Sequence, residues 1–260
     1  MEQRLTEQHA EGVSAGMLKV VAVITMFIDH FGLAILGRLL LTGACGAHRQ
    51  EIYIIYRIMR DIGRNAFPIY AFLLAEGITY THSKWRYLLR IGLLAFISEV
   101  PFDLAFKARI LEFTYQNVFF TLFLGLLMLI GMQLTLRKSF FAGHLWADRI
   151  VKGCLLLVIC AAAAGAATVL CCDYRWRGVL LIGVLYLLRP WKQLQLMAGY
   201  LVCLVVLGEF WAFPAFLLLF FYRGKKGVSS KVFFYGFYPV HLGMLYLISV
   251  WMGLAYCSVL

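Results

Sequence analysis

Residues 17–41 read MLKVVAVITMFIDHFGLAILGRLLL, an apolar stretch interrupted by Lys19, the adjacent pair Asp29 and His30, and Arg38. A helix of about 20 apolar residues crosses the hydrocarbon core of a bilayer, so this stretch is long enough to span it. Ionisable side chains inside such a helix are costly and mark functional positions. The stretch therefore predicts a membrane helix whose polar residues carry the function.

The composition of the whole chain predicts the same class of protein. Of the 260 residues, 63% are hydrophobic and 14% are charged, and the mean hydropathy is +0.83. Soluble domains carry roughly 25% charged residues, and a soluble fold of this length could not bury so much apolar surface. A water-soluble enzyme, a disordered chain and a DNA-binding domain are excluded. No CxxC pair or Cys/His metal spacing is present, so no metal site is predicted.

Apolar runs between polar breaks predict the membrane spans. We expect an all-α polytopic transmembrane helical bundle with about nine spans, within roughly 8–11. Residues 1–16 are expected to form a short polar tail without a cleavable signal, and residues 17–260 a single integral-membrane domain. The predicted runs are 17–41, 62–81, 87–106, 115–134, 151–170, 176–189, 194–208, 210–222 and 232–256.

The distribution of Lys and Arg predicts the orientation. With the N-terminus inside, about 15 of the 24 basic residues lie on the cytoplasmic side. The formal charge of +11 is explained by such flanking residues, and their scatter argues against a nucleic-acid partner. The first outer loop does not fit, because it holds Arg38, Arg49, Arg57, Arg60 and Arg64. Either these residues are functional, or the loop lies elsewhere.

Lys19 and His30 share one face of the first predicted helix. Eleven residues make three turns plus ~20° and a rise of ~16 Å. Lys19 then lies at the cytoplasmic surface and His30 near the midplane, with Asp29 ~100° round the helix. A histidine is well suited to moving a proton near neutral pH. The alternative is a buried polar anchor bonded to a neighbouring helix.

The second predicted span opens with an arginine stripe. Arg57, Arg60 and Arg64 are spaced i, i+3, i+7, and their forked side chains suit phosphate or carboxylate. The alternative is an interfacial helix that holds lipid head groups. Pro68 is expected to break or kink the span unless neighbouring groups satisfy the carbonyl that it frees. Glu76 lies deeper and needs a partner.

The third predicted span places Glu99 and Asp103 at i, i+4 with Pro101 between them. Two carboxylates so placed repel each other, which suits a carboxyl group that holds or orients a proton. The alternative is pairing with an arginine of the second span.

Later polar residues supply further candidates. Asn117 and Thr121 offer hydrogen bonds between helices. Asp173 lies in CDYRWRG (172–178) beside two arginines, and an interfacial charge pair is expected there. His241 is a second histidine within an apolar run, and it is either functional or a packed polar residue.

Several segments resemble TraX proteins and occur in the order found in that family, over roughly residues 17–245. They are LKVVAVITMFIDHFG (18–32), GRNAFPIYAFLLAEGITYTHSKWRYLLR (63–90), ISEVPFDLAF (97–106), QNVFFTLFLGLL (116–127), DYRWRGVLLIG (173–183) and FYGFYPVHL (234–242). TraX proteins are associated with N-terminal acetylation of pilin. The family is similar to integral-membrane acyltransferases of the acyltransferase-3 type, in which a basic residue precedes a first-helix histidine by ten intervening residues, as Lys19 precedes His30.

The resemblance implies a membrane-bound, acyl-CoA-dependent acetyltransferase. It would move an acetyl group from cytoplasmic acetyl-CoA to an amine or hydroxyl of an acceptor at or across the bacterial cytoplasmic (inner) membrane. The acceptor stays open between a protein N-terminus, a glycan and a small molecule, and the pilin substrate does not carry over. The expected partners are the lipid bilayer, acetyl-CoA and that acceptor. The oligomeric state is open, a homo-oligomer included.

The expected catalytic residues are His30 as general base, with Asp29 or Glu99 fixing its tautomer. Asn117 or Thr121 would donate to the oxyanion, and a dry tunnel would lead to the thioester. The residues expected to hold the CoA donor are Lys19, Arg64, Arg86 and Arg90. The other expected site residues are Arg57, Arg60, Glu76, Asp103, Asn117, Thr121, Asp173 and His241.

Two rival functions remain. One is a proton-coupled transporter or flippase, with Asp29, His30, Glu76 and Glu99 as a proton relay. The other is a non-catalytic membrane partner of a secretion or pilus system, which predicts that alanine at His30 leaves function intact.

Overall fold

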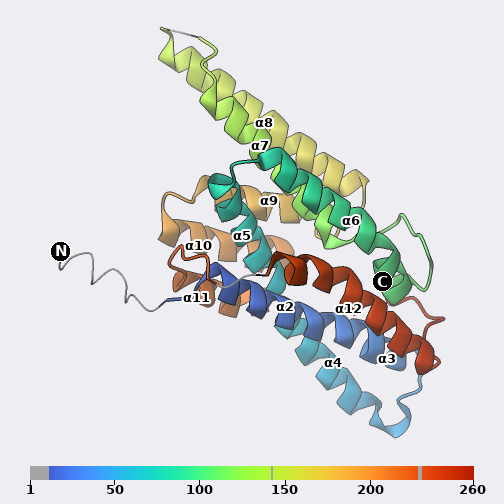
Figure 1. The fold of residues 1–260 in the computed structure, drawn as a ribbon. Helices are drawn as coiled ribbons and strands as arrows, with labels where there is room; N and C mark the ends of the chain where they lie inside the picture. Colours follow the sequence, from blue (N-terminus) through green and yellow to red (C-terminus); the bar gives the residue numbers. More distant parts are fainter. Residues whose placement is uncertain (1–11, 142, 228–229) are drawn as a thin grey trace.

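The computed structural model describes residues 12–141, 143–227 and 230–260, which fold into helices joined by loops, with two isolated β-bridges (Figure 1). This confirms the all-α prediction for the described part of the chain, whereas the predicted tail 1–16 lies largely outside it. The helices are α2 (Ala15–Phe31), η2 (Gly32–Gly37), α3 (Arg38–Thr42), η3 (Gly46–His48), α4 (Arg49–Gly63), α5 (Ala66–Tyr80), α6 (Lys84–Lys107), α7 (Val118–Arg137), α8 (Leu145–Val169), α9 (Arg175–Leu187), α10 (Lys192–Leu201), η4 (Val202–Leu207), η5 (Phe210–Ala212), α11 (Phe213–Phe220) and α12 (Lys231–Trp251).

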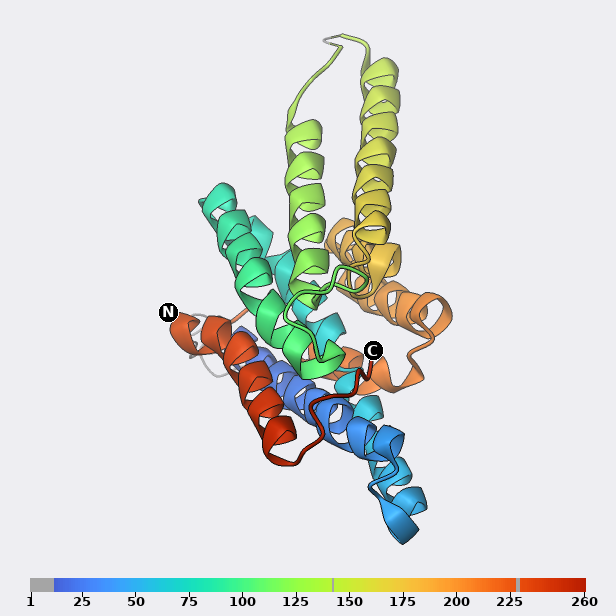
Figure 2. The ribbon, with the colours of Figure 1, turned by 90° about the vertical axis from the view of Figure 1, so that its right-hand side faces the viewer.

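Six helices pack as a closed ring. Going round it, α2 contacts α12, α12 contacts α6, α6 contacts α7, α7 contacts α9, α9 contacts α5, and α5 contacts α2. The other helices lie outside this ring, α4 against α2 and α8 against α7 and α9. The hairpin of α7 and α8 projects beyond the rest of the molecule (Figure 2). The ring places parts of α2, α6 and α12 that are distant in sequence around one interior.

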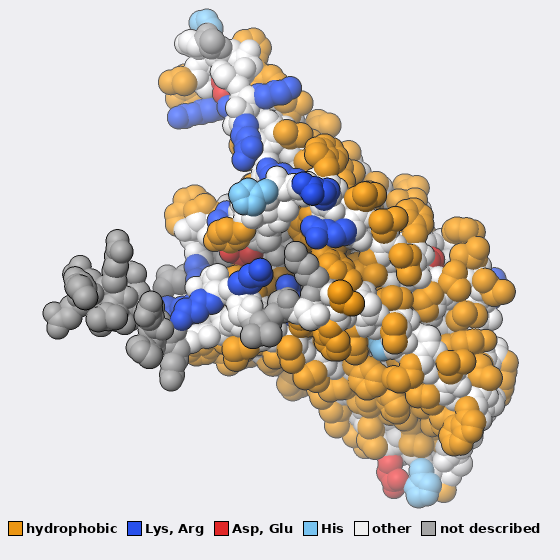
Figure 3. Space-filling model, in the orientation of Figure 1, with side chains coloured by type: hydrophobic (Ala, Val, Ile, Leu, Met, Phe, Trp, Pro, Cys, Tyr) orange, Lys and Arg blue, Asp and Glu red, His pale blue; other side chains and the backbone are white. Residues whose placement is uncertain are grey.

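Four helical segments are long and apolar enough to cross a membrane: Ala15–Thr42, Val118–Arg137, Leu145–Val169 and Val232–Trp251. In α8 only Ala167 is fully buried, and apolar side chains such as Ile150, Leu157 and Val158 are exposed, as they are on a helix with one face to lipid. Hydrophobic side chains cover most of the face in Figure 3, while Lys and Arg gather toward the N-terminus and along the α7–α8 hairpin. The predicted membrane class is thereby supported. The other predicted runs also form helices, which are shorter or more charged than these four.

The region between the first two predicted spans differs from the expected loop. It holds α4, and the helical structure is interrupted at Arg64 and Asn65 before α5 begins at Ala66. Pro68 therefore lies in the first turn of α5, where a missing N–H removes no intrahelical bond. The predicted span 62–81 is thus interrupted ahead of Pro68, as the expectation of a break or kink requires, and the helix is regular from Ala66 onward.

The start of α2 lies at one end of the bundle, called here the N-terminal end. The amide of Ala15 donates to the carbonyl of Lys225 at 2.8 Å, which ties α2 to the segment after α11. Lys192 Nζ donates to the carbonyl of Tyr222 at 2.6 Å, and Glu76 pairs with Arg189 at 3.0 Å. Glu76 thus has the partner that its depth in an apolar run requires.

The contact between α2 and α4 depends on a glycine. A Cβ added at Gly63 would overlap the Cβ and carboxylate of Asp29, whereas a Cβ at Gly153 on α8 would meet nothing within 4 Å. We expect Gly63→Ala to lower the free energy of unfolding by about 1–3 kcal/mol through overpacking. The control Gly153→Ala should leave it unchanged or raise it by about 0.5–1 kcal/mol. Thermal unfolding of the detergent-purified variants measures both, and equal midpoints would contradict this account of the α2–α4 contact.

Candidate active site

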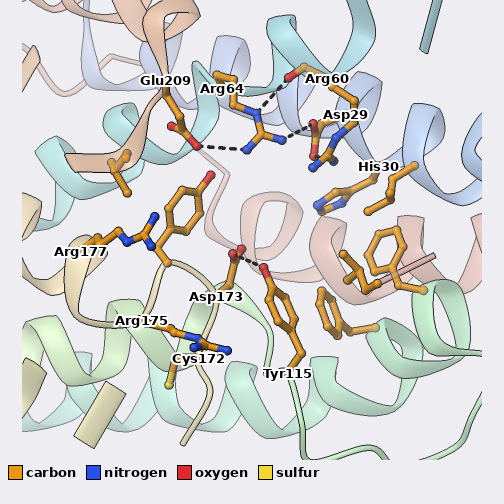
Figure 4. Close-up of a pocket in the computed structure, with 16 residues that line it drawn as sticks. Asp29, His30, Arg60, Arg64, Tyr115, Cys172, Asp173, Arg175, Arg177 and Glu209 are labelled. Atoms are coloured by element: carbon orange, nitrogen blue, oxygen red, sulfur yellow. Dashed lines mark hydrogen bonds and ion pairs between the residues drawn. The ribbon is translucent and has the colours of Figure 1, made fainter. Parts of the chain in front are cut away.

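A cavity of about 310 Å³ lies at the end of the bundle opposite the N-terminal end, where α6 finishes and α9 begins (Figure 4). His30 from α2 lines it together with apolar side chains of η2 and α6, such as Leu33 and Phe106. Most of its charged residues come from other segments. The charged lining residues are Asp29, Arg60, Arg64, Asp173, Arg175, Arg177 and Glu209.

The two histidines within apolar runs form a pair. His30 Nδ1 lies 2.7 Å from His241 Nε2, and His241 Nδ1 lies 2.7 Å from the carbonyl oxygen of Phe237. A carbonyl only accepts, so we assign the proton of His241 to Nδ1, which leaves a lone pair on its Nε2. His30 Nδ1–H then donates to that lone pair. In the neutral tautomer so assigned, Nε2 of His30 carries the lone pair that a general base needs.

A cluster of buried charges lies beside this pair. Arg60 Nη1 donates to Asp29 Oδ2 at 2.7 Å, and Arg64 Nη2 lies 3.5 Å from Asp29 Oδ1. Arg64 Nη1 also donates to Glu209 Oε1 at 3.0 Å. Asp29 is thus bonded to arginines, and the expectation that it fixes the His30 tautomer is not met by this geometry. Its place ~100° round the helix turns it toward α4, and His241 takes the orienting position.

The arginines of the misfitting first loop are accounted for by the same contacts. Arg60 and Arg64 are half-buried and paired with carboxylates. Arg38 is fully buried and donates to the carbonyls of Cys257 at 2.9 Å and Leu104 at 3.3 Å. These three basic residues are held inside the protein, so the positive-inside count should not include them. The other two of the five, Arg49 and Arg57, are exposed on α4 and do not line this cavity.

Asp173 sits in the turn between α8 and α9 and has a different partner from the expected one. Tyr115 donates its hydroxyl to Asp173 Oδ1 at 2.6 Å, and neither neighbouring arginine pairs with the carboxylate. Burial raises the pKa of the Asp173 carboxyl, while the bond from Tyr115 opposes that shift. The side chain of Thr121 donates to the Asp173 carbonyl. The predicted oxyanion role of Thr121 therefore conflicts with the structure, because its proton is already used.

The same turn has an uncommon backbone. Cys171, Tyr174 and Arg175 have φ angles of 52°, 62° and 45°, which is the left-handed region. Such conformations cost about 1–3 kcal/mol each and persist only where the surroundings impose them. Two backbone bonds hold the turn against the loop before α7, Gln116 N to the carbonyl of Cys171 and Asp173 N to the carbonyl of Gln116, each at 2.9 Å.

Glu99 and Asn117 lie together, away from the cavity lining. The Asn117 side-chain amide donates to Glu99 and to the carbonyl of Ala95, and its oxygen accepts from the amide of Phe119 at 3.0 Å. Asp103 accepts from the amide of Glu112 at 2.7 Å. Asn117 caps the start of α7, where free amides attract carboxylates. This arrangement differs from the expectation that Glu99 orients His30 and from the expectation that Asn117 donates to the oxyanion. It also differs from the alternative, in which Glu99 and Asp103 pair with arginines of the second span.

Three of the four residues expected to hold the donor lie at the N-terminal end. Lys19 Nζ lies 5.7 Å from the centre of the Phe234 ring. Arg86 donates to Ser83 Oγ at 2.9 Å, and Arg90 donates to the Arg86 carbonyl at 3.1 Å. Only the fourth, Arg64, lines the cavity.

Sequence analysis missed several residues that the fold brings to the cavity: Tyr115, Tyr174, Arg175, Arg177 and Glu209. Glu209 had a usable signal, because it is a lone carboxylate between two apolar runs, the same criterion that selects Glu76. The two arginines were considered only as partners of Asp173. The tyrosines carry no signal in a chain this rich in aromatic residues.

The similarity of this chain to known proteins shows its family. The TraX protein family matches residues 14–249. The chain belongs to the TraX family. A relative from Dichelobacter nodosus, described as probable fimbrial assembly protein FimC of serogroup H1, is 29% identical over 259 residues, covering 89% of this chain and 94% of the relative. No solved structure matches this TraX family member.

Arg64 provides a test of the charge cluster. We expect Arg64→Met to lower the free energy of unfolding by roughly 3–5 kcal/mol, because it leaves the Glu209 carboxylate buried without its cation. The double variant Arg64→Met/Glu209→Gln should recover part of that loss. Arg57→Met, on the exposed part of the same stripe, should change stability by less than about 0.5 kcal/mol. Chemical or thermal unfolding in detergent measures all three.

The loss of stability in Arg64→Met should depend on pH through the Glu209 carboxyl. Burial raises its pKa above the ordinary 4.5, and Arg64 opposes that shift. Without Arg64 the folded state holds this proton more tightly than the unfolded chain does. The deficit of Arg64→Met is therefore smallest below the ordinary carboxyl pKa and grows as the pH rises through the raised one. A deficit that shrinks with rising pH would contradict the pairing.

Proposed function

We propose that this TraX family member is a membrane-bound acyltransferase in which His30 is the general base, acetyl-CoA the donor, and an amine or hydroxyl the acceptor. The observation that carries the proposal is the His30–His241 pair, because it leaves a lone pair on Nε2 of a histidine that lines a charged cavity. Family membership supports it, as does the eleven-residue separation of Lys19 and His30 on one helix.

The reaction needs a base and a place for the proton. Acetyl-CoA supplies an acetyl thioester. Nε2 of His30 accepts the proton of the acceptor N–H or O–H as the new bond to the acetyl carbon forms and the C–S bond breaks. The proton then passes to the departing thiolate. His241 accepts from Nδ1–H of His30 and stabilises the imidazolium, as the acid member of a catalytic triad does.

The donors available for the oxyanion differ from those expected. Asn117 and Thr121 are occupied by Glu99 and by the Asp173 carbonyl. Arg60 follows from the geometry as the replacement, because it lines the cavity and bonds Asp29, the neighbour of His30 in sequence. A fixed cation aimed at developing negative charge contributes strongly in a site that excludes water.

The donor's phosphates are proposed to bind at the N-terminal end, on the cytoplasmic side of the bacterial inner membrane. Arg86 and Arg90 line a depression of about 530 Å³ there. This orientation, the nine-span arrangement and the acyltransferase-3-like fold are parts of the same proposal. They are supported by the basic residues of that end and by the helix within each apolar run. The fimbrial assembly description of the relative favours a role in pilus biogenesis.

The transporter alternative receives less support from the structure. Its four relay residues each have a different partner: Asp29 bonds arginines, His30 bonds His241, Glu76 bonds Arg189, and Glu99 bonds Asn117. Among the described residues, no hydrogen bond or ion pair joins these four side chains into one chain, as a proton relay needs.

The test uses purified protein in detergent with radiolabelled acetyl-CoA. We expect wild type to be stabilised by acetyl-CoA and to hydrolyse it slowly. His30→Ala should keep the thermal shift and lose about 10²–10⁴-fold in turnover. His241→Phe keeps a ring but removes the acceptor of Nδ1–H, so it should lower kcat with KM unchanged. His144→Ala, before α8 and outside the cavity, is the matched control and should keep full turnover.

Absence of both binding and turnover in wild type at millimolar acetyl-CoA would end the acyltransferase proposal. Full turnover by His30→Ala would end the assignment of the base while leaving the reaction class in place.

A further inference from the structure

Arg175 and Arg177 differ from the other arginines of the cavity. Both are exposed residues at the start of α9, and both line the cavity. Arg60 and Arg64 are neutralised by carboxylates, whereas neither Arg175 nor Arg177 has an ion pair with any residue that the structure describes. With Arg60 and Arg64 balanced by Asp29 and Glu209, these two arginines and Asp173 leave a net charge of +1 in the cavity (Figure 4).

Glu209, which also lines the cavity, lacks a hydrogen-bond donor on one of its carboxylate oxygens within the part of the chain that the structure describes. Glu209 is only 7% exposed, and its Oε1 accepts from Arg64 at 3.0 Å. Its Oε2 is buried and has no hydrogen-bond partner among the described residues. A buried carboxylate oxygen without a donor is costly, roughly 1–3 kcal/mol or more. Because Glu209 lines the cavity, a ligand can supply the missing donor.

We infer that this cavity binds a phosphate-bearing ligand, with the phosphate on Arg175 and Arg177, an amine or hydroxyl proton directed at His30, and a further donor group at Glu209. The inference rests on the proposed function, in which this ligand is the acyl acceptor. A guanidinium fork bonds two oxygens of a phosphate and leaves a third for another donor, whereas a carboxylate offers only two oxygens in total. The pair of arginines therefore favours phosphate over carboxylate.

The phosphates of the donor are not the expected occupants of this pair. Lys19, Arg86 and Arg90 lie toward the other end of the molecule, and His30 is ~16 Å along α2 from Lys19. Donor and acceptor would then approach the reacting atoms from opposite ends, each with its own basic residues.

The experiment measures phosphate binding without acetyl-CoA. Full-length protein in detergent is titrated with glycerol 3-phosphate, with glycerol as the neutral control, and thermal stability is followed. We expect glycerol 3-phosphate alone to stabilise wild type. Arg175→Gln/Arg177→Gln should weaken its binding by about 100-fold or more, since at least two charge-assisted hydrogen bonds are lost. Arg109→Gln is the matched control, because Arg109 is an exposed arginine that does not line the cavity, and it should bind as wild type does.

A second arm identifies the source of the phosphate. The same proteins are placed in vesicles of phosphatidylcholine with or without phosphatidylglycerol. Stabilisation by phosphatidylglycerol, lost in the double variant, supports the site with a lipid headgroup as its ligand. Stabilisation by free glycerol 3-phosphate alone supports it with a soluble phosphate.

A third arm adds acetyl-CoA. An acetyl-CoA shift that is equal in wild type and the double variant supports separate donor and acceptor sites. Loss of that shift in the double variant overturns the inference, because the arginines would then hold the donor, and it leaves the proposed function in place. Failure of every phosphate probe on wild type also overturns it. Phosphate binding without any response to acetyl-CoA would support the site and count against the acyltransferase instead.

Discussion

The charge cluster of Asp29, Arg60, Arg64 and Glu209 is the interaction on which the rest of the site depends. It joins α2, the end of α4 and the segment before α11, three parts of the chain that are far apart in sequence. In a medium of low dielectric such pairs are held tightly only when every member has its partner. By fixing α4 against α2, the cluster forms one wall of the cavity and leaves the neighbouring His30 free to bond His241.

Much of the fold could be predicted because the signal is local. Each apolar run contains a helix, since hydrophobic length alone decides whether a segment can cross a bilayer. The helix α4 was not expected as a separate element because its residues are amphipathic, with mean hydropathy too low to read as a span. Pro68 does signal the interruption at Arg64 and Asn65, but it does not tell whether the preceding residues belong to the span or to a separate helix.

The sequence predicts which residues line the cavity better than it predicts which of them contact one another. His30, Asp29, Arg64 and Asp173 were selected because ionisable groups in apolar runs are costly, and the fold brings them to one cavity. Their partners could not be derived, since His30 and His241 are 211 residues apart and meet only because α2 packs on α12. A donor that is already hydrogen-bonded within the fold cannot serve a ligand as well. A sequence shows that Asn117 has an amide, but not that this amide is already used.

The short helices near the cavity bear on the membrane itself. α9 has 13 residues and is about 20 Å long, whereas the hydrocarbon core is about 30 Å thick. A helix of that length spans the core only where the bilayer thins or where water enters at one end. Such hydrophobic mismatch costs fractions of a kcal/mol per Å. The thickness of the surrounding lipid thus becomes a variable that sets the depth of His30 below the membrane surface.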